Sequence, residues 1–157
     1  MNQYDFVDEY LDNLTKQEIS SYEIPPGRAL RNLLELQKEL NLLLPKDLID
    51  FYSFSYAPRF EEYKFLTFEE IRKEIDKCIY VYDEYWDNSM VPFSLLMGVG
   101  DMIVFNTAIS DTEGTLIVDG FHEIPPIEWK PICYGLENWL REMVNNKFRP
   151  FWLDQHP

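Results

Sequence analysis

Groups that could act as nucleophiles or general bases are scarce in this sequence. The only histidines are His122 and His156, and His122 lies next to Glu123 in a predicted turn. Cys78 follows Lys77, but its place on the apolar face of a predicted helix makes it a poor thiolate. Because an enzyme needs a placed nucleophile, base or metal, we predict no catalytic residue and no enzymatic activity.

Motifs that bind metals or nucleotides are also missing. Two cysteines, Cys78 and Cys133, are too few for a disulfide framework or a zinc site, and histidines and acids do not cluster with ligand spacing. The stretch Asp111-Thr112-Glu113-Gly114 lacks the closing glutamate of a calcium loop and predicts a hairpin turn instead. Gly98-Val99-Gly100 is not followed by Gly-Lys-Ser/Thr, which excludes a phosphate loop. We therefore predict no metal and no cofactor.

The charged residues are distributed unevenly along the chain. The net charge is -14, from 28 acids and 14 bases, and no Lys or Arg occurs between Lys77 and Lys130. Phosphate binding needs Lys and Arg, so this span argues against direct contact with nucleic acid. It suits a protein partner with a basic surface, although acidity that serves only solubility explains it equally well. The acids of this base-free span are Asp83, Glu84, Asp87, Asp101, Asp111, Glu113, Asp119, Glu123 and Glu128.

Aromatic residues are interleaved with acids in the stretch Tyr80-Val81-Tyr82-Asp83-Glu84-Tyr85-Trp86-Asp87. This stretch is either the end of a helix or a loop. Tyr and Trp among acids are typical of a protein-binding edge, where such rings make good anchors. The alternative, which we favour, is that the rings pack on the core while the acids face water.

Hydrophobic spacing predicts helices in the first and last parts of the chain. Residues 4–14 predict an amphipathic helix with an acidic outer face, and residues 28–41 a second helix whose leucine stripe is expected in the core. Pro45 begins a third helix. The capping box Thr67-Phe68-Glu69-Glu70 begins a fourth. The clearest stripe, from Leu136 to Phe148, predicts a closing helix.

The middle of the chain predicts strands. The segment from Met102 to Phe105 has no polar alternation, which predicts a central strand buried on both faces. The segment Val91 to Met97 is its expected partner, and Thr115 to Val118 is the returning strand of a meander. Ile127-Glu128-Trp129 predicts a last edge strand, because Pro131 cannot donate to a central ladder.

A tight turn precedes the apolar strand. Gly98 and Gly100 permit the positive φ that turns often need, and Asp101 readily caps a turn through backbone N–H groups. We therefore assign these three residues a structural role in the turn.

Length and composition indicate one folded domain. The 157 residues include 46% hydrophobic and 16% aromatic residues, which is enough for a sizeable core. No apolar run approaches the roughly 20 residues of a membrane helix. The segment Met1 to Asp5 lacks the basic region that begins a secretory signal. We therefore expect a cytoplasmic protein with no membrane partner.

The order of several motifs resembles the SUKH superfamily, which includes the yeast cell-wall-synthesis regulator and many bacterial immunity proteins. These motifs are Leu44-Pro45 before a short aromatic helix, the capped helix at Thr67, Gly98-Val99-Gly100-Asp101 with its strand, and the segment from Leu136 to Leu140. The resemblance covers about residues 28–146. It implies an α+β domain in which helices pack on a twisted, largely antiparallel sheet.

The resemblance also divides the chain and implies a function. Residues 1–27 would be an N-terminal helical extension, 28–149 the SUKH-like domain, and 150–157 a C-terminal tail. The implied function is that of an immunity protein, which binds and occludes a cognate secreted toxin, such as a nuclease or deaminase with a basic surface. The alternative is a regulatory or scaffold module of the same fold without a toxin partner.

We place the partner-binding surface on the acidic loops of the base-free span. The residues predicted to contact the partner are Asp83, Glu84, Tyr85, Trp86, Asp87, Asp111, Glu113 and Asp119.

Overall fold

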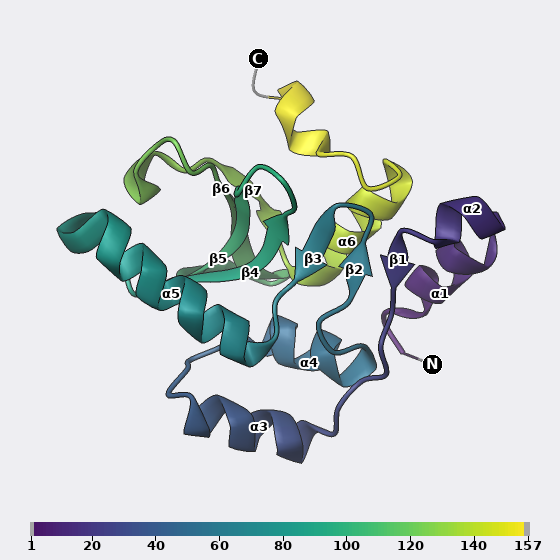
Figure 1. Cartoon of the computed structure of the whole chain (residues 1–157), viewed down its shortest axis with the longest axis horizontal. Coiled ribbons are helices and arrows are strands. Elements are labelled where there is room, and N and C mark those ends of the chain that lie inside the picture. Colours follow the sequence, from purple (N-terminus) through teal and green to yellow (C-terminus); the bar gives the residue numbers. More distant parts are fainter. Residues whose placement is uncertain (1, 156–157) are drawn as a thin grey trace.

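A seven-stranded sheet forms the centre of the structure, a computed structural model that describes residues 2–155 (Figure 1). Each strand pairs antiparallel with the next one along the chain, so the sheet runs from β1 to β7 without a crossover. This arrangement confirms the predicted α+β class and the largely antiparallel sheet. The strands are β1 (Tyr22–Glu23), β2 (Arg59–Phe60), β3 (Tyr63–Phe65), β4 (Met90–Leu96), β5 (Met102–Asp111), β6 (Gly114–Gly120) and β7 (Pro131–Tyr134).

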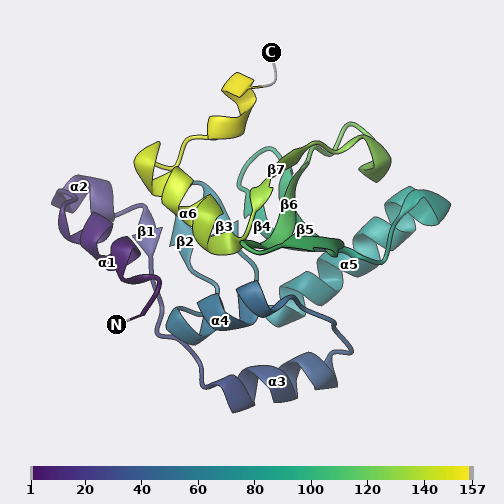
Figure 2. The ribbon, with the colours of Figure 1, turned by 180° about the vertical axis from the view of Figure 1, so that it is seen from behind.

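Helices surround this sheet, and α3 forms an outer layer against α4 (Figure 2). Within the described part of the chain, the α-helices are α1 (Asp5–Asp12), α2 (Lys16–Ile19), α3 (Leu30–Glu39), α4 (Lys46–Phe54), α5 (Phe68–Tyr82) and α6 (Leu136–Asn145). Short 3₁₀ turns are η1 (Asp83–Tyr85), η2 (Pro126–Glu128) and η3 (Phe151–Gln155).

The middle strands are buried on both faces, as the apolar run from Met102 to Phe105 predicts. One face of the sheet packs into the main core with Phe51 of α4 and Trp139 of α6. The other face joins a smaller apolar cluster that includes Trp86 and Trp129. The sheet residues in the main core include Val91, Phe93, Ile103, Phe105 and Ile117, and those in the smaller cluster include Met90, Met102, Val104, Leu116 and Val118.

Residues near both ends of the chain contribute to the main core. Tyr4 and Val7 are buried in it, and Tyr22 of β1 pairs with Phe60 of β2. Trp152 of η3 is also buried and lies beside Trp139, with ring centroids 6.3 Å apart.

The predicted capping box at the start of α5 is present. The Thr67 hydroxyl accepts from the Glu70 amide at 3.1 Å, and the Thr67 amide donates to the Glu70 carboxylate at 2.9 Å. Both bonds satisfy amides that would otherwise lack partners in the first turn of the helix.

Two sequence-based expectations differ from the structure. Ile127-Glu128-Trp129 is not a strand, because η2 and its C-cap occupy it, and the edge strand is β7, which begins at Pro131. Proline is compatible with that place because the first residue of an edge strand need not donate to a neighbour. The leucine stripe of α3 is only partly in the core. Leu33 is buried, whereas Leu30 and Leu34 are 53% and 46% exposed, since α3 packs chiefly against α4.

Candidate protein-binding surface and adjoining pocket

Three aromatic rings fix the end of α5. The Tyr82 ring stacks on Trp86 with centroids 6.1 Å apart, and the edges of both rings meet Trp129, at 5.9 and 6.1 Å. Trp86 is buried, and its indole Nε1 has no hydrogen-bond partner among the described residues. The ring of Trp86 therefore packs inside the smaller cluster and does not reach the surface.

Trp129 also orders the loop between β6 and β7. Its indole N–H donates to the carbonyl oxygens of Phe121 and Ile124, at 3.0 and 3.2 Å. The Tyr82 hydroxyl donates to the carbonyl oxygen of His122 at 3.5 Å. These contacts hold the loop beside the end of α5, and the two segments are neighbours in both views of the ribbon (Figures 1 and 2).

We name residues 83–87 and 121–129 together the acidic end. Both segments lie at the same corner of the fold, and neither contains Lys or Arg. The acid side chains there face solvent, and exposed apolar residues lie on these segments or on the adjoining last turn of α5. The acids are Asp83, Glu84, Asp87, Glu123 and Glu128, and the exposed apolar residues are Tyr80, Val81, Tyr85 and Ile127.

The tip of the β5–β6 hairpin is a separate location. Asp111 accepts there from the amides of Glu113 and Gly114, at 2.8 and 3.3 Å, as the hairpin-turn prediction requires. The Glu113 carboxylate accepts from the Asn138 side chain of α6 at 3.0 Å. These two predicted contact residues therefore lie against α6 and not in the acidic end.

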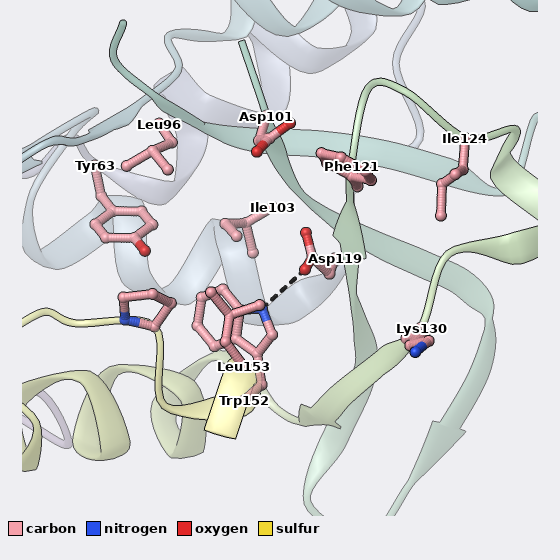
Figure 3. A pocket seen from close by; sticks show the side chains of 11 residues that line it. Tyr63, Leu96, Asp101, Ile103, Asp119, Phe121, Ile124, Lys130, Trp152 and Leu153 are labelled. Atoms are coloured by element: carbon pink, nitrogen blue, oxygen red, sulfur yellow. Dashed lines mark hydrogen bonds between the residues drawn. The ribbon is translucent and has the colours of Figure 1, made fainter. Parts of the chain in front are cut away.

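Asp119, the last predicted contact residue, lines a pocket of about 470 Å³. The sheet supplies Ile103 and Asp119, the loop after β6 supplies Phe121 and Ile124, and the C-terminal segment supplies Trp152 (Figure 3). Asp119 is half-buried and accepts from the Trp152 indole N–H at 3.0 Å. The structure thus divides the predicted contact residues among three places.

Asp101 connects the glycine turn to the wall of this pocket. Gly98 and Gly100 have φ values of 91° and 79°, which only glycine adopts without strain. The Asp101 carboxylate accepts from the His122 backbone N–H at 3.2 Å and lies 2.6 Å from its ring Nδ1. The Asp101 carboxylate therefore binds the backbone amide of His122, 21 residues along the chain. These two residues flank the paired strands β5 and β6, so the bond does not cap the turn that contains Asp101.

A family model described as SMI1 / KNR4 family (SUKH-1) matches residues 29–142. The chain belongs to this family. The match confirms the resemblance to the SUKH superfamily and supports an immunity or regulatory role as the general function. Comparison with curated proteins gives no significant match.

The SUKH-1 match includes both segments of the acidic end and the hairpin tip. It also includes Asp101, Asp119 and the other residues that the sheet and the loop contribute to the pocket. The C-terminal wall, made by Pro150, Trp152 and Leu153, lies beyond the match. The pocket is therefore built from the SUKH-1 core and from a segment that follows it in this chain.

The described part of this SUKH-1 structure offers little evidence for a catalytic or metal-binding site. His122 is 48% exposed, and no hydroxyl or thiol of the described residues hydrogen-bonds to its ring. Burial raises the pKa of the Cys78 and Cys133 thiols to about 12, so both are protonated at neutral pH. No group of three His, Cys, Asp or Glu in residues 2–155 could hold a metal ion. His156 lies outside the described residues.

No helix in the described part of the chain is both long enough and apolar enough to cross a bilayer.

Two acids of the acidic end were not among the predicted contacts. Glu123 and Glu128 lie about forty residues after Asp83 in the sequence, and the contacts of Trp129 and His122 with Tyr82 and Trp86 bring them to the same corner. The sequence held one signal for them, because both belong to the base-free span. No sequence pattern indicated the pocket, because its walls come from segments far apart in the chain.

Proposed function

We propose that this SUKH-1 protein is an immunity protein that binds a cognate secreted toxin and occludes it through the acidic end. The toxin would be a nuclease or deaminase whose substrate groove is basic, and the carboxylates of the acidic end would take the place of nucleic-acid phosphates. The observation that carries the proposal is the gathering of five exposed acids, without a base in either segment, around exposed Tyr85 and Ile127.

The composition of the acidic end suits a protein partner. A tyrosine and aliphatic side chains provide apolar contact area, while surrounding acids accelerate the approach of a basic protein. An acidic surface of this kind repels nucleic acid, which argues against direct nucleic-acid binding. The same features fit a regulatory or scaffold partner with a basic surface, so the identity of the partner decides between the two roles.

The first experiment identifies the partner. The tagged full chain is used to capture proteins from the source cells, and the bound protein is identified and assayed for nuclease or deaminase activity. A toxin that loses activity when the full chain is added supports the immunity role. A bound regulatory protein without toxic activity supports the alternative.

The second experiment tests the surface with the purified partner. The triple variant Asp83→Asn, Glu84→Gln, Asp87→Asn should lower the association rate about tenfold at low salt, because it removes three charges from the acidic end.

The control variant is Asp8→Asn, Glu9→Gln, Asp12→Asn on α1, which changes the net charge by the same amount at another site. It should alter the rate less than about twofold. Equal effects of the two variants, or an affinity that stays constant across about a tenfold range of salt, would contradict docking through the acidic end.

A further inference from the structure

We propose that the pocket beside Asp101 and Asp119 binds an arginine side chain together with an adjoining apolar residue of the docked partner, an inference that rests on the proposed function. The pocket is the second recognition element of the molecule, next to the acidic end.

The size and lining of the pocket fit such a pair of side chains. Its volume of about 470 Å³ falls within the range of about 300–1,000 Å³ typical of specific ligand sites, so one arginine alone leaves space for a neighbouring residue. Leu96, Ile103 and Ile124 provide aliphatic walls, and Phe121 and Trp152 provide aromatic ones. In Figure 3, Ile103 lies on the sheet side, and Trp152 and Leu153 lie across from it.

The charge of the pocket favours a cation. Asp101 and Asp119 line it together with a single base, Lys130, which is exposed. Burial raises the pKa of the Tyr63 hydroxyl, and the negative fields of Asp119, Glu62 and Asp101 raise it further. Tyr63 also lines the pocket. The fields of Asp101 and Asp119 that act on Tyr63 therefore make the interior of the pocket electrically negative.

A purely apolar occupant would be poorly accommodated. Both carboxylates already accept from protein donors, Trp152 and His122, but an apolar occupant would remove water from their charges, and such desolvation is costly. A guanidinium supplies several N–H donors in one plane, stacks on aromatic rings and is more weakly hydrated than an ammonium. Arginine therefore suits both the negative charge and the aromatic walls of the pocket.

The position of the pocket connects it to the acidic end. The loop from Phe121 to Trp129 belongs to the acidic end, and its residues Phe121 and Ile124 also form the wall of the pocket. Asp101 holds this loop through His122. A basic protein that covers the acidic end therefore approaches the mouth of the pocket with its own surface arginines.

The test is an NMR titration of the full chain with N-acetyl-Phe-Arg-amide and, as the neutral isostere, N-acetyl-Phe-citrulline-amide. We expect the arginine peptide to shift the Trp152 indole N–H and the Ile103 methyl signals and to bind about tenfold tighter than the citrulline peptide, the size expected for a hydrogen bond to a charged group. Similar binding of the two peptides, no shift at Trp152, or strongest shifts at Trp86 would overturn the proposal.

Matched variants separate the pocket from the general charge of the protein. Asp101→Asn and Asp119→Asn each keep an acceptor, for the His122 and Trp152 N–H groups respectively, but remove the charge. Each should weaken binding of the arginine peptide about tenfold and leave the citrulline peptide unchanged. Asp111→Asn removes the same charge at the hairpin tip and should have no effect. An equal loss in all three variants would contradict a specific site.

Failure here is distinguishable from failure of the proposed function. If the captured partner binds in a salt-dependent way through the acidic end but the arginine peptide does not enter the pocket, the pocket inference is wrong and the function stands. If the peptide binds as expected but no basic partner exists, the proposed function is wrong and the arginine chemistry of the pocket is supported.

Discussion

Asp47 shows how a single side chain can join distant parts of this fold. It lies in the first turn of α4, yet its two oxygens accept from the Thr115 hydroxyl of β6 at 2.9 Å and from the Leu136 amide of α6 at 3.1 Å. Gly135 lets the chain pass close by, since a Cβ there would collide with the Glu113 carbonyl oxygen. Asp47 therefore satisfies an amide at the start of α6 that its own helix leaves without a partner.

Replacing Asp47 should destabilise the protein. We expect Asp47→Ala to lower the free energy of unfolding by about 1–3 kcal/mol, because the hydroxyl of buried Thr115 and a helix N-terminal amide lose their acceptor. Asp47→Asn should cost less, since it keeps one acceptor oxygen. Urea denaturation measures both.

The control is Asp50→Ala on the same helix, which breaks only the exposed pair with Lys46 and should cost less than about 0.5 kcal/mol. An equal cost for Asp47→Ala and Asp50→Ala would show that the contacts of Asp47 do not stabilise the fold.

The two cysteines should be unreactive in the folded protein. Their pKa of about 12, against 9.0 for an ordinary thiol, lowers the thiolate fraction near pH 8 by about three orders of magnitude. We expect modification by a thiol reagent to be slow in the native state and fast in urea, measured by absorbance. Rapid modification of native Cys78 or Cys133 would contradict their burial.

At the scale of elements, the loop between β6 and β7 is held mainly by Trp129. Its ring packs against Tyr82 and Trp86, and its indole N–H bonds two loop carbonyls. The loop has only the short turn η2 as regular structure, so these contacts, with those of His122 to Asp101 and Tyr82, determine its position. The acidic end and one wall of the pocket both depend on them.

The variant Trp129→Phe should loosen the loop while leaving the sheet intact. It keeps an aromatic ring but removes both N–H bonds, at a cost of about 1 kcal/mol. Hydrogen exchange of amides in residues 121–128 should accelerate about fivefold, with smaller changes in β5, because local opening needs less energy than global unfolding. A uniform acceleration throughout the chain would show that Trp129 contributes to global stability and not to loop order.

At the scale of the whole molecule, acids outnumber bases by 28 to 14, and some of them form ion pairs. Seven such pairs occur among the described residues, four of them between positions i and i+4 of a helix, and one involves His122 with Asp101. Most acids in this part of the chain therefore have no paired base, and the net charge is -14. Self-repulsion of this kind opposes the compact state while it attracts basic partners.

Added salt should stabilise the isolated protein. Screening weakens the repulsion among surface acids, so we expect the melting temperature to rise by about 2–5 °C between low salt and about 0.5 M NaCl. Differential scanning calorimetry measures the change. A decrease would mean that the ion pairs, such as Lys64 with Glu70, outweigh the repulsion.

The local features of this protein follow from its sequence. The capping box at Thr67, the hairpin turn at Asp111, the doubly buried segment from Met102 to Phe105 and the stripe of α6 all depend on neighbours within a few residues. Helix caps, turn chemistry and hydrophobic periodicity are set over such short distances, so residue spacing is sufficient to predict them. The order of the motifs resembled the SUKH superfamily, and the family match confirms that resemblance.

The surface and the pocket were decided only by tertiary structure. The sequence left Trp86 as either a contact or a core residue, with the core favoured, and packing against Trp129 buries it. Asp101 pairs with His122 21 residues away, and Asp47 with Leu136 89 residues away. No local pattern encodes such pairs, because they form only when the sheet and its helices close around a shared core, and that closure determines which acids lie together on the surface.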